Sequence, residues 1–307
     1  MKNPKKVAIS IGDLNGIGIE LALRNHKRIS QSIEAVYCVD KAMLAQAAKK
    51  LKLDIPDDFV TIEDIAPYFD IEAGVISKES GAYAYASFVK AVALAKSKEV
   101  TAVCTLPIHK KAWERAGVKY KGHTDALRDF FKADAIMMLG CEKMYVALFT
   151  EHIPLKEVAK SINEKDLTRF LLDFYEAVKP TSKVAVLGLN PHAGDNGVLG
   201  DEELVIQKAI DNANKKSNFI FSNPLVPDVA FTPNVRKNYS YYIAMYHDQG
   251  LAPLKALYFD EGINVSLNLP IVRTSVDHGT AFDLAYKNAT LSNLSYLNAI
   301  RYIEGVL

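Results

Sequence analysis

Short apolar runs rich in β-branched residues alternate with longer amphipathic stretches from one end of the chain to the other. The short runs predict strands, and the longer stretches, with apolar residues at helical spacing, predict helices. This alternation favours an α/β fold with largely parallel sheets and helices on both faces. The expected strands are Val7–Ile11, Ala35–Val39, Ala102–Leu106, Met144–Phe149, Lys183–Leu189, Ile243–Tyr246 and Asn264–Leu267. The expected helices are Gly18–Arg24, Lys41–Leu51, Ala82–Lys96, Glu164–Val178, Ala281–Lys287 and Leu291–Ile303.

Length and charge limit the class of protein further. The 307 residues correspond to about two domains at roughly 150 residues each. Lys plus Arg total 37 and Asp plus Glu total 36, so nothing suggests electrostatic capture of nucleic acid or of an anionic membrane. No apolar run has the length of a membrane span, and the basic start lacks the apolar core of a signal peptide.

The cysteine residues indicate the cellular compartment. Cys38, Cys104 and Cys141 are widely spaced, odd in number and match no zinc-ligand pattern. We expect them to be reduced, mostly buried thiols. The sequence therefore predicts a cytoplasmic protein.

Glycine-containing polar segments follow several of the expected strands, where open α/β sheets place their ligands. The first is IGDLNGIGIE (11–20), between a strand and a helix. Its glycines allow a tight turn and let backbone N–H groups face an anion. The segment is neither GxGxxG nor a Walker A loop, so it matches no dinucleotide or triphosphate motif. A purely structural turn explains it equally well.

Three histidines also follow expected strands: His152, His192 and His247. Neutral imidazole is the commonest metal ligand in proteins, and three imidazoles that leave one position open are a catalytic arrangement for zinc. Any one of them alone is more often a structural or surface histidine. Because all three follow successive strands, a shared metal site is about as well supported as three separate structural histidines. The spacing between the histidines does not decide between these alternatives.

Two further clusters could bind a phosphate or carboxylate. Gly122–Asp125 offers the imidazole of His123 and the hydroxyl of Thr124 at an expected helix N-terminus, although Thr124 could simply cap that helix. Lys255, Asn264 and Arg273 lie in largely apolar sequence, where a buried cation needs an anion to offset its desolvation. A solvated face is the commoner location of a lone arginine.

The last unusual segment is DHGTAFD (277–283). Its position ahead of an expected helix could present backbone N–H groups to a nucleotide. It could equally be an N-cap formed by Thr280.

Taken together, five blocks resemble the 4-hydroxythreonine-4-phosphate dehydrogenase family of vitamin B6 biosynthesis. They are GDLNGIGIE (12–20), GHTD (122–125), LNPHAGDNGVLGDEE (189–203), MYHDQGLAPLK (245–255) and GINVSLNLPIVRTSVDHGTAFDLA (262–285). The resemblance runs from about residue 7 to the C-terminus. The first block departs from the family's usual GDPAGIGPE at Leu14, Asn15 and Ile19.

The resemblance implies a role for each matching residue. It implies one divalent ion per site (Zn, Mg or Co), with a homodimer in which the third histidine comes from the other subunit. The implied metal ligands are His152, His192 and His247, and the implied substrate contacts are His123, Thr124, Lys255, Asn264 and Arg273. Within this reading, Lys255, Asp228 and Asp248 are the candidate proton carriers or partners of the ligands.

The block at the C-terminal end is similar to the loop that holds the adenosine of NAD in isocitrate and isopropylmalate dehydrogenases. It implies NAD or NADP binding by His278, Gly279, Thr280 and Asp283 without a Rossmann fingerprint. The same kinship implies a discontinuous first α/β domain (1–128 with 261–307) and a second α/β domain (129–260) that carries most metal ligands.

The implied reaction is NAD(P)-dependent oxidation of 4-hydroxythreonine 4-phosphate at C3, followed by decarboxylation to 3-amino-2-oxopropyl phosphate. Three alternatives remain. A related dehydrogenase could act on threonate or erythronate 4-phosphate, a phosphate acyltransferase could share the fold, and a non-catalytic metabolite-binding protein could share the anion pocket. The last two have no need of three metal-binding histidines.

Overall fold

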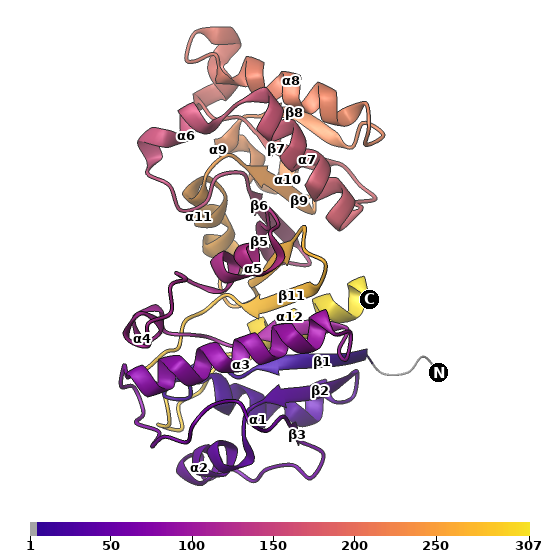
Figure 1. Ribbon diagram of the computed structural model, residues 1–307. Helices are drawn as coiled ribbons and strands as arrows, with labels where there is room; N and C mark the ends of the chain where they lie inside the picture. The colour runs from indigo at the N-terminus through magenta and orange to yellow at the C-terminus, as the bar shows by residue number, and fades with distance from the viewer. Residues whose placement is uncertain (1–4) are drawn as a thin grey trace. The chain divides into compact units, whose positions relative to one another are not determined.

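A computed structural model describes residues 5–307 and shows two compact α/β units (Figure 1). The first unit comprises the chain up to Ala133 together with Leu269–Leu307, and the second is Asp134–Asn268. No described helix has the length and hydrophobicity needed to cross a bilayer. Cys38, Cys104 and Cys141 are buried and form no disulfide.

The first unit is built on a parallel sheet with the strand order β3-β2-β1-β4-β11. Nearly every residue of the inner strands is buried, as expected of a parallel sheet covered on both faces. The strands are β1 (Lys5–Ser10), β2 (Ile33–Cys38), β3 (Val60–Thr61), β4 (Ala102–Thr105) and β11 (Val272–Val276).

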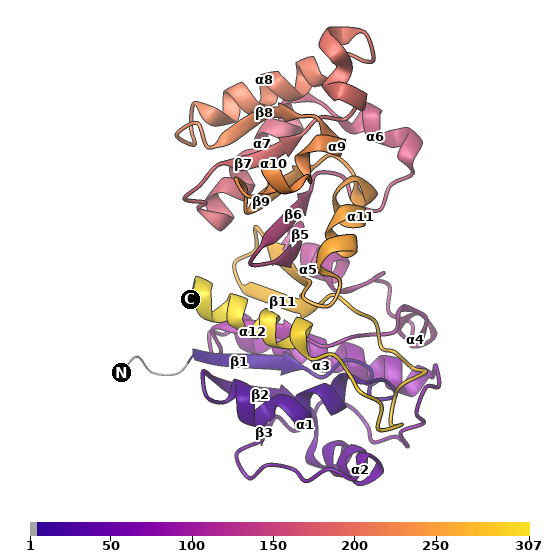
Figure 2. The ribbon, with the colours of Figure 1, turned by 180° about the vertical axis from the view of Figure 1, so that it is seen from behind.

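Helices cover both faces of this sheet. Helix α3 packs on β1, β2 and β4, and its start is capped by Ser77, whose hydroxyl accepts from the Ser80 N–H. Helices α1 and α12 lie on the opposite face, in front in the view from behind (Figure 2). The helices are α1 (Gly18–Ile29), α2 (Lys41–Leu51), α3 (Lys78–Lys96), α4 (Lys110–Arg115), α5 (His123–Phe131) and α12 (Leu294–Val306).

The second unit has the strand order β10-β5-β6-β9-β7-β8. Pairings β10–β5 and β5–β6 are antiparallel, whereas β6, β9, β7 and β8 run parallel to their neighbours. The strands are β5 (Ile136–Cys141), β6 (Met144–Leu148), β7 (Val184–Leu187), β8 (Phe221–Leu225), β9 (Tyr241–Ala244) and β10 (Ile263–Leu267).

Helices cover both faces of this sheet as well, and alternate side chains along β9 contact helices on opposite faces. Tyr241 contacts Phe174 of α7, whereas Tyr242 and Ala244 join a core with Leu251 of α11. The helices are α6 (Leu155–Ser161), α7 (Glu164–Val178), α8 (Glu202–Asn214), α9 (Pro227–Ala230), α10 (Pro233–Arg236), α11 (His247–Tyr258) and the 3₁₀ segment η1 (Pro191–Gly197).

The expected α/β fold is confirmed, but two local predictions are wrong. Residues 281–287 form turns rather than a helix, since Ala281 and Tyr286 have positive φ and the Tyr286 hydroxyl donates to the Leu14 carbonyl. The second concerns Arg273, around which no strand was expected and where β11 lies.

Candidate functional site

The three histidines lie at one edge of the second unit. Strands β6, β9 and β7 are parallel neighbours, so the segments that follow them emerge at the same edge. His152 lies between β6 and α6, His247 is the first residue of α11, and His192 lies in η1. The rings of His152 and His247 of one chain have centroids 5.5 Å apart.

His247 is oriented by its neighbour Asp248. Its Nδ1–H can donate to the Asp248 carboxylate at 2.7 Å, which leaves Nε2 for a metal ion. Carboxylates of this kind fix the tautomer and orientation of metal-binding imidazoles. Asp248 is exposed and is therefore better placed as a partner of His247 than as a buried base.

His192 lies in a left-handed turn. Five consecutive residues from His192 to Asn196 have φ between 43° and 78°, and all but Gly194 carry a side chain. Such residues cost about 1–2 kcal/mol each, so the surrounding structure must enforce the turn.

The carboxylate of Glu203 holds the beginning of this turn. Its Oε1 accepts from the backbone N–H groups of Leu189 and Asn190 at 2.8 and 2.7 Å, and its Oε2 accepts from the Asn190 amide. A Cβ at Gly194 would lie 2.6 Å from the same carboxylate. Glu203 therefore fixes the segment that carries His192, a role that sequence reasoning missed.

Within the described residues of one chain, no three His, Cys, Asp or Glu side chains come close enough to hold a metal ion. The predicted ligands share one edge of the second unit, but one chain alone does not assemble all three. His152 and His192 are exposed and His247 is partly exposed, so all three are accessible to a partner.

The other predicted residues of this unit lie on three elements. Asp228 is exposed on α9, Lys255 is partly exposed in the last turn of α11, and Asn264 lies on β10. The side-chain oxygen of Asn264 is buried and accepts no hydrogen bond from the described residues. Such an atom is costly to bury alone and is available to a ligand donor.

Arg273 dominates the first unit's candidate anion site. It lies on β11, is 2% exposed, and its Nη2 donates to the Thr105 hydroxyl at the end of β4 at 2.6 Å. Burial lowers the pKa of this guanidinium to about 10. A charge buried to this extent favours binding of a complementary anion. Thr105 orients the guanidinium, and no sequence pattern pointed to this residue.

His123 lies beside this charge. Its ring packs against Phe88 and Trp113, and its pKa is well below the ordinary value because of burial and of the nearby Arg273 charge. The ring is therefore neutral near pH 7, and its buried Nε2 has no hydrogen-bond partner among the described residues. A neutral imidazole can donate one hydrogen bond to a bound anion.

Thr124 is buried in the first turn of α5 and is not the N-cap, a position that Gly122 occupies. The first N–H groups of α5 thus have no partner within the helix, an arrangement suited to an anion.

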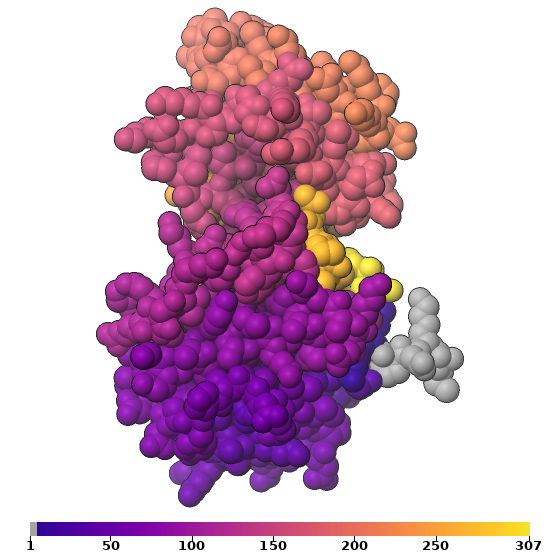
Figure 3. Space-filling view, viewed as in Figure 1, coloured from indigo at the N-terminus to yellow at the C-terminus, as the bar shows by residue number. Residues whose placement is uncertain are grey.

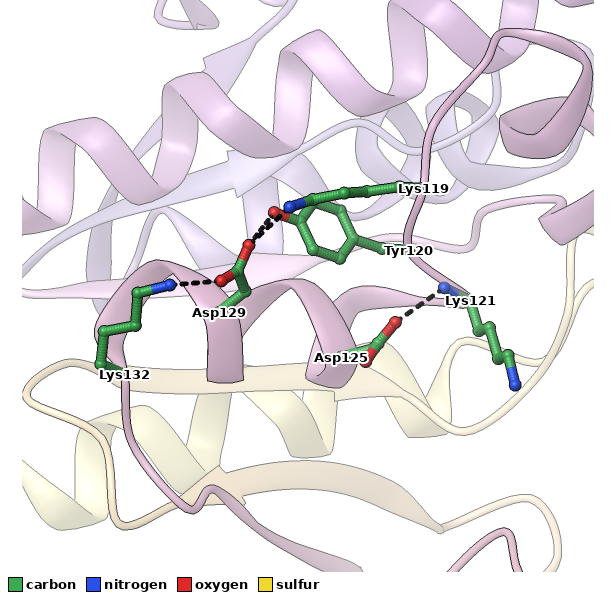
Figure 4. Close-up of polar contacts among 6 residues, drawn as sticks. All are labelled: Lys119, Tyr120, Lys121, Asp125, Asp129 and Lys132. Atoms are coloured by element: carbon green, nitrogen blue, oxygen red, sulfur yellow. Dashed lines mark hydrogen bonds and ion pairs between the residues drawn. The ribbon is translucent and has the colours of Figure 1, made fainter.

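An ionic cluster fixes the chain that leads into α5 (Figure 4). The Asp125 carboxylate accepts from the Lys121 N–H at 3.0 Å. Asp129 accepts from Lys132, Tyr120 and Lys119, and these bonds hold the pKa of its carboxyl well below the usual range. Both carboxylates tie the preceding loop to the helix that carries His123.

The expected nucleotide-binding segments meet at the edge where β1, β4 and β11 end. The Ile17 N–H donates to the Thr280 carbonyl at 3.1 Å, and the Asp13 N–H donates to the Pro107 carbonyl at 2.9 Å. Gly16 has no room for a side chain, since a Cβ would lie 2.8 Å from the Thr280 oxygen. No helix follows Thr280, so the prediction that it caps one is wrong.

His278, Gly279 and Asp283 belong to the same edge. The His278 Nδ1 lies 3.0 Å from the Gly279 carbonyl, and Gly279 and Asp283 are exposed. The ring of Phe282, between them, stacks on His109 with centroids 4.9 Å apart. These contacts leave the glycine backbone and the Asp283 carboxylate open to a ligand.

The three departures in the first block have structural explanations. Leu14 and Ile19 are fully buried. The Asn15 amide donates to the Val75 carbonyl at 2.8 Å and accepts from the Glu72 N–H at 2.9 Å, so it anchors the 72–75 loop. These residues pack the interior, and they give no reason to expect a different ligand.

Asp13 provides a pH-dependent prediction for the first unit. Burial raises the pKa of its carboxyl from 3.8 to about 6, although the Asn15 N–H and the Ser80 hydroxyl oppose the rise. The folded state therefore binds more protons than the unfolded state between about pH 4 and 6, and this contribution to stability is lost as the pH rises. The loss corresponds to about 3 kcal/mol.

We expect Asp13→Asn to gain stability relative to the unsubstituted protein as the pH increases from 4.5 to 7.5. Urea unfolding of both proteins at several pH values measures this difference. Asp57→Asn, an exposed change in the same unit, serves as a control. A difference that is constant with pH would show that Asp13 does not titrate in this range.

Comparisons with known proteins agree with the sequence blocks. The model of a family described as pyridoxal phosphate biosynthetic protein PdxA matches residues 25–303. A protein named 4-hydroxythreonine-4-phosphate dehydrogenase from Sulfurimonas denitrificans is 60% identical over 96% of this chain and 96% of its own length. Another of that name from Campylobacter fetus is 50% identical over 97% and 96%. A crystal structure of a 4-hydroxythreonine-4-phosphate dehydrogenase from Burkholderia phymatum superposes with a TM-score of 0.81, at 29% identity over 99% of this chain and 98% of that one.

Proposed function

Since the chain belongs to the PdxA family of pyridoxal phosphate biosynthetic proteins, we propose that it oxidises 4-hydroxythreonine 4-phosphate at C3 with NAD or NADP and releases 3-amino-2-oxopropyl phosphate after decarboxylation. The observation that carries this proposal is the 60% identity, over almost the entire length of both chains, with a protein named 4-hydroxythreonine-4-phosphate dehydrogenase. The same relationship argues against an acyltransferase and against a non-catalytic binding protein.

The second unit's histidines are the proposed metal ligands. Support comes from the position of all three at one edge of the sheet and from the Asp248 contact that leaves Nε2 of His247 available. When bound, a divalent ion supplies a Lewis acid that polarises the oxygen on C3 of the substrate. Imidazole ligands favour a transition-metal ion such as Zn or Co over Mg, which prefers oxygen ligands, and the residues do not distinguish between Zn and Co.

The first unit's buried cation is the proposed binding group for the phosphate or carboxylate. Arg273 supplies a fixed guanidinium fork, oriented by Thr105, and His123 adds a neutral imidazole donor. The N–H groups that begin α5 at His123 and Thr124 can complete the hydrogen bonds to the anion. Lys255 and Asn264 are proposed to contact the rest of the substrate.

Residues of the second unit are proposed to transfer the protons. Lys255 is proposed to exchange the proton of the C3 hydroxyl, and Asp248 to keep His247 in the tautomer that leaves Nε2 unprotonated. Asp228, exposed on α9, is the other candidate base. His278, Gly279, Thr280 and Asp283 would hold NAD or NADP, which would supply the hydride acceptor.

We also propose a homodimer with ligands from both subunits in each metal site. Large apolar side chains are exposed on the segments that carry the histidines and on helices α8 and α9, which contact η1, and apolar surface at such a position supports an interface with a partner. They are Ile153, Leu155, Val198, Leu199, Leu204 and Val229. Leu155 and Val198 are 70% and 77% exposed.

Complementation between two inactive variants tests this arrangement. A His247→Ala chain retains His152 and His192, and a His152→Ala chain retains His247. If His247 completes the site of the other subunit, the heterodimer contains one intact site, and mixing should restore up to about half of the unsubstituted activity per dimer. Verified heterodimers without activity above either parent would show that each chain supplies its own His247.

The activity assay separates the proposed substrate from its relatives. We expect reduction of NAD or NADP with 4-hydroxythreonine 4-phosphate in the presence of Zn, Mg or Co, and slower turnover with threonate and erythronate 4-phosphates. A preference for either of these would establish the related four-carbon dehydrogenase, the second candidate. Absence of reduction with all three, by protein shown to be folded and loaded with metal, would contradict the proposed function.

A further inference from the structure

A side-chain amide joins the strand ends that lead to two of the histidines. Gln249, in the first turn of α11, is buried, and its Oε1 accepts from the Met245 N–H at 2.8 Å. Its Nε2 donates to the Gly188 carbonyl at 2.7 Å. Met245 directly follows β9, and Gly188 directly follows β7. One side chain thus connects the segment that leads to His247 with the segment that leads to His192.

The backbone ladder explains why a side chain is needed here. Strands β7 and β9 pair from Val184 opposite Tyr241 to Val186 opposite Ile243, and beyond this point they diverge. The buried Met245 N–H and Gly188 carbonyl would then lack partners, at a cost of about 1–3 kcal/mol for each unsatisfied group. An amide is suited to this position because it accepts at one atom and donates at the other.

The segment that carries the third histidine, His152, is also hydrogen-bonded to Met245. Thr150, two residues after β6, donates both its N–H (3.2 Å) and its hydroxyl (2.6 Å) to the Met245 carbonyl. Thr150 is buried and stands two positions before His152. Met245 is therefore held on one side by Gln249 and on the other by Thr150, and the ends of all three strands are linked.

Gly250 allows α11 to reach this position. A Cβ at Gly250 would lie 2.4 Å from Cγ1 of Val146 on β6 and 2.9 Å from Cβ of Ala244 on β9. The absence of a side chain lets the first turn of α11 lie directly on the two strands. The close approach directs the adjacent Gln249 side chain toward the strand ends.

We propose that Gln249, assisted by Thr150, is a positioning residue that sets the relative placement of the segments carrying His152, His192 and His247, and thereby the metal affinity of the sites to which these histidines contribute. This inference rests on the proposed metal site, and neither residue contacts the ion or the substrate. Polar groups behind metal ligands typically change affinity by about 10- to 100-fold when removed. For Gln249 we expect the lower end of this range, since it acts through the backbone.

Gln249→Met tests the inference because methionine has nearly the same length and no charge but cannot form either hydrogen bond. The metal-free protein is titrated with Co²⁺ against a chromophoric chelator, and the visible spectrum of the cobalt complex is recorded. We expect the Kd for Co²⁺ to rise about 10-fold and the cobalt bands to change. Gln207→Met, a change at a partly exposed residue of α8 in the same unit, is the matched control and should bind as the unsubstituted protein does.

The thermal midpoint of the metal-free variants separates positioning from stability. A lower midpoint with unchanged Kd and unchanged cobalt bands would show that Gln249 is only structural and would overturn the proposal. If Gln249→Met does not fold, Thr150→Val takes its place, with a smaller increase in Kd expected, and an unchanged Kd would again overturn it. Failure of the unsubstituted protein to bind Co²⁺ would refute the metal site itself, and with it this inference.

Discussion

Replacement of Arg273 by lysine is expected to weaken binding of the phosphorylated substrate by about 10- to 150-fold while NAD binding stays almost unchanged. Arg273 is 2% exposed, and the Thr105 hydroxyl fixes the plane of its guanidinium. Lysine keeps the charge but loses the planar fork that makes two parallel hydrogen bonds to a phosphate or carboxylate. The loss corresponds to about 1.5–3 kcal/mol for one charge-assisted bond.

Steady-state kinetics with varied substrate and direct titration with NAD measure the two effects separately. Arg301→Lys, an exposed change on α12 of the same unit, is the control for the substitution itself. A thermal midpoint within a few degrees of the unsubstituted value shows that the sheet is intact. An unaltered KM for the phosphorylated substrate would exclude Arg273 from the substrate site.

Replacement of His152 by alanine is expected to remove most of the bound metal and to reduce activity by two or more orders of magnitude. The expected loss is large because the ion is proposed to stabilise the developing charge on the C3 oxygen, an effect worth several kcal/mol. His152 is exposed, so alanine should leave the fold and the thermal midpoint of the metal-free protein unchanged. Metal content by elemental analysis and turnover at saturating Co²⁺ are the measurements.

Lys156→Ala, an exposed change in the adjacent helix α6, should retain both metal and activity. Chelator treatment of the unsubstituted protein should abolish activity, and added divalent metal should restore it. Full activity of metal-free protein would show that the three histidines have another role.

Local patterns predict the elements of this fold well where burial and spacing agree. Glu164–Val178 was expected with the bounds of α7, since its apolar residues recur at helical spacing and Asn163 caps it. Residues 281–287 have the same kind of pattern but form turns, because Tyr286 is held by a hydrogen bond to the distant Leu14 carbonyl. Tertiary contacts of this kind override local preference and leave no trace in the local sequence.

In the candidate site too, residues with a local sequence signal were predicted, whereas residues that act through distant contacts were not. Strand ends and chemically unusual residues were enough to choose His152, His192, His247 and Arg273. Thr105, Glu203 and Gln249 were missed because each acts on the backbone or on a side chain of another segment, and threonine, glutamate and glutamine are common residues. The left-handed turn at His192 has no sequence pattern that would predict it.

The first unit is formed by two parts of the chain that are separated by the second unit. This separation determines the order in which those parts can assemble during synthesis. Arg273 bonds to Thr105, which precedes it by 168 positions, and β11 can pair with β4 only after the whole second unit has left the ribosome. Until then β4 has an unpaired edge, of the kind that promotes aggregation. Sequence-distant pairing of this kind also slows folding. A truncated chain that ends before Val272 should therefore lack the anion site and should depend on chaperones to stay in solution.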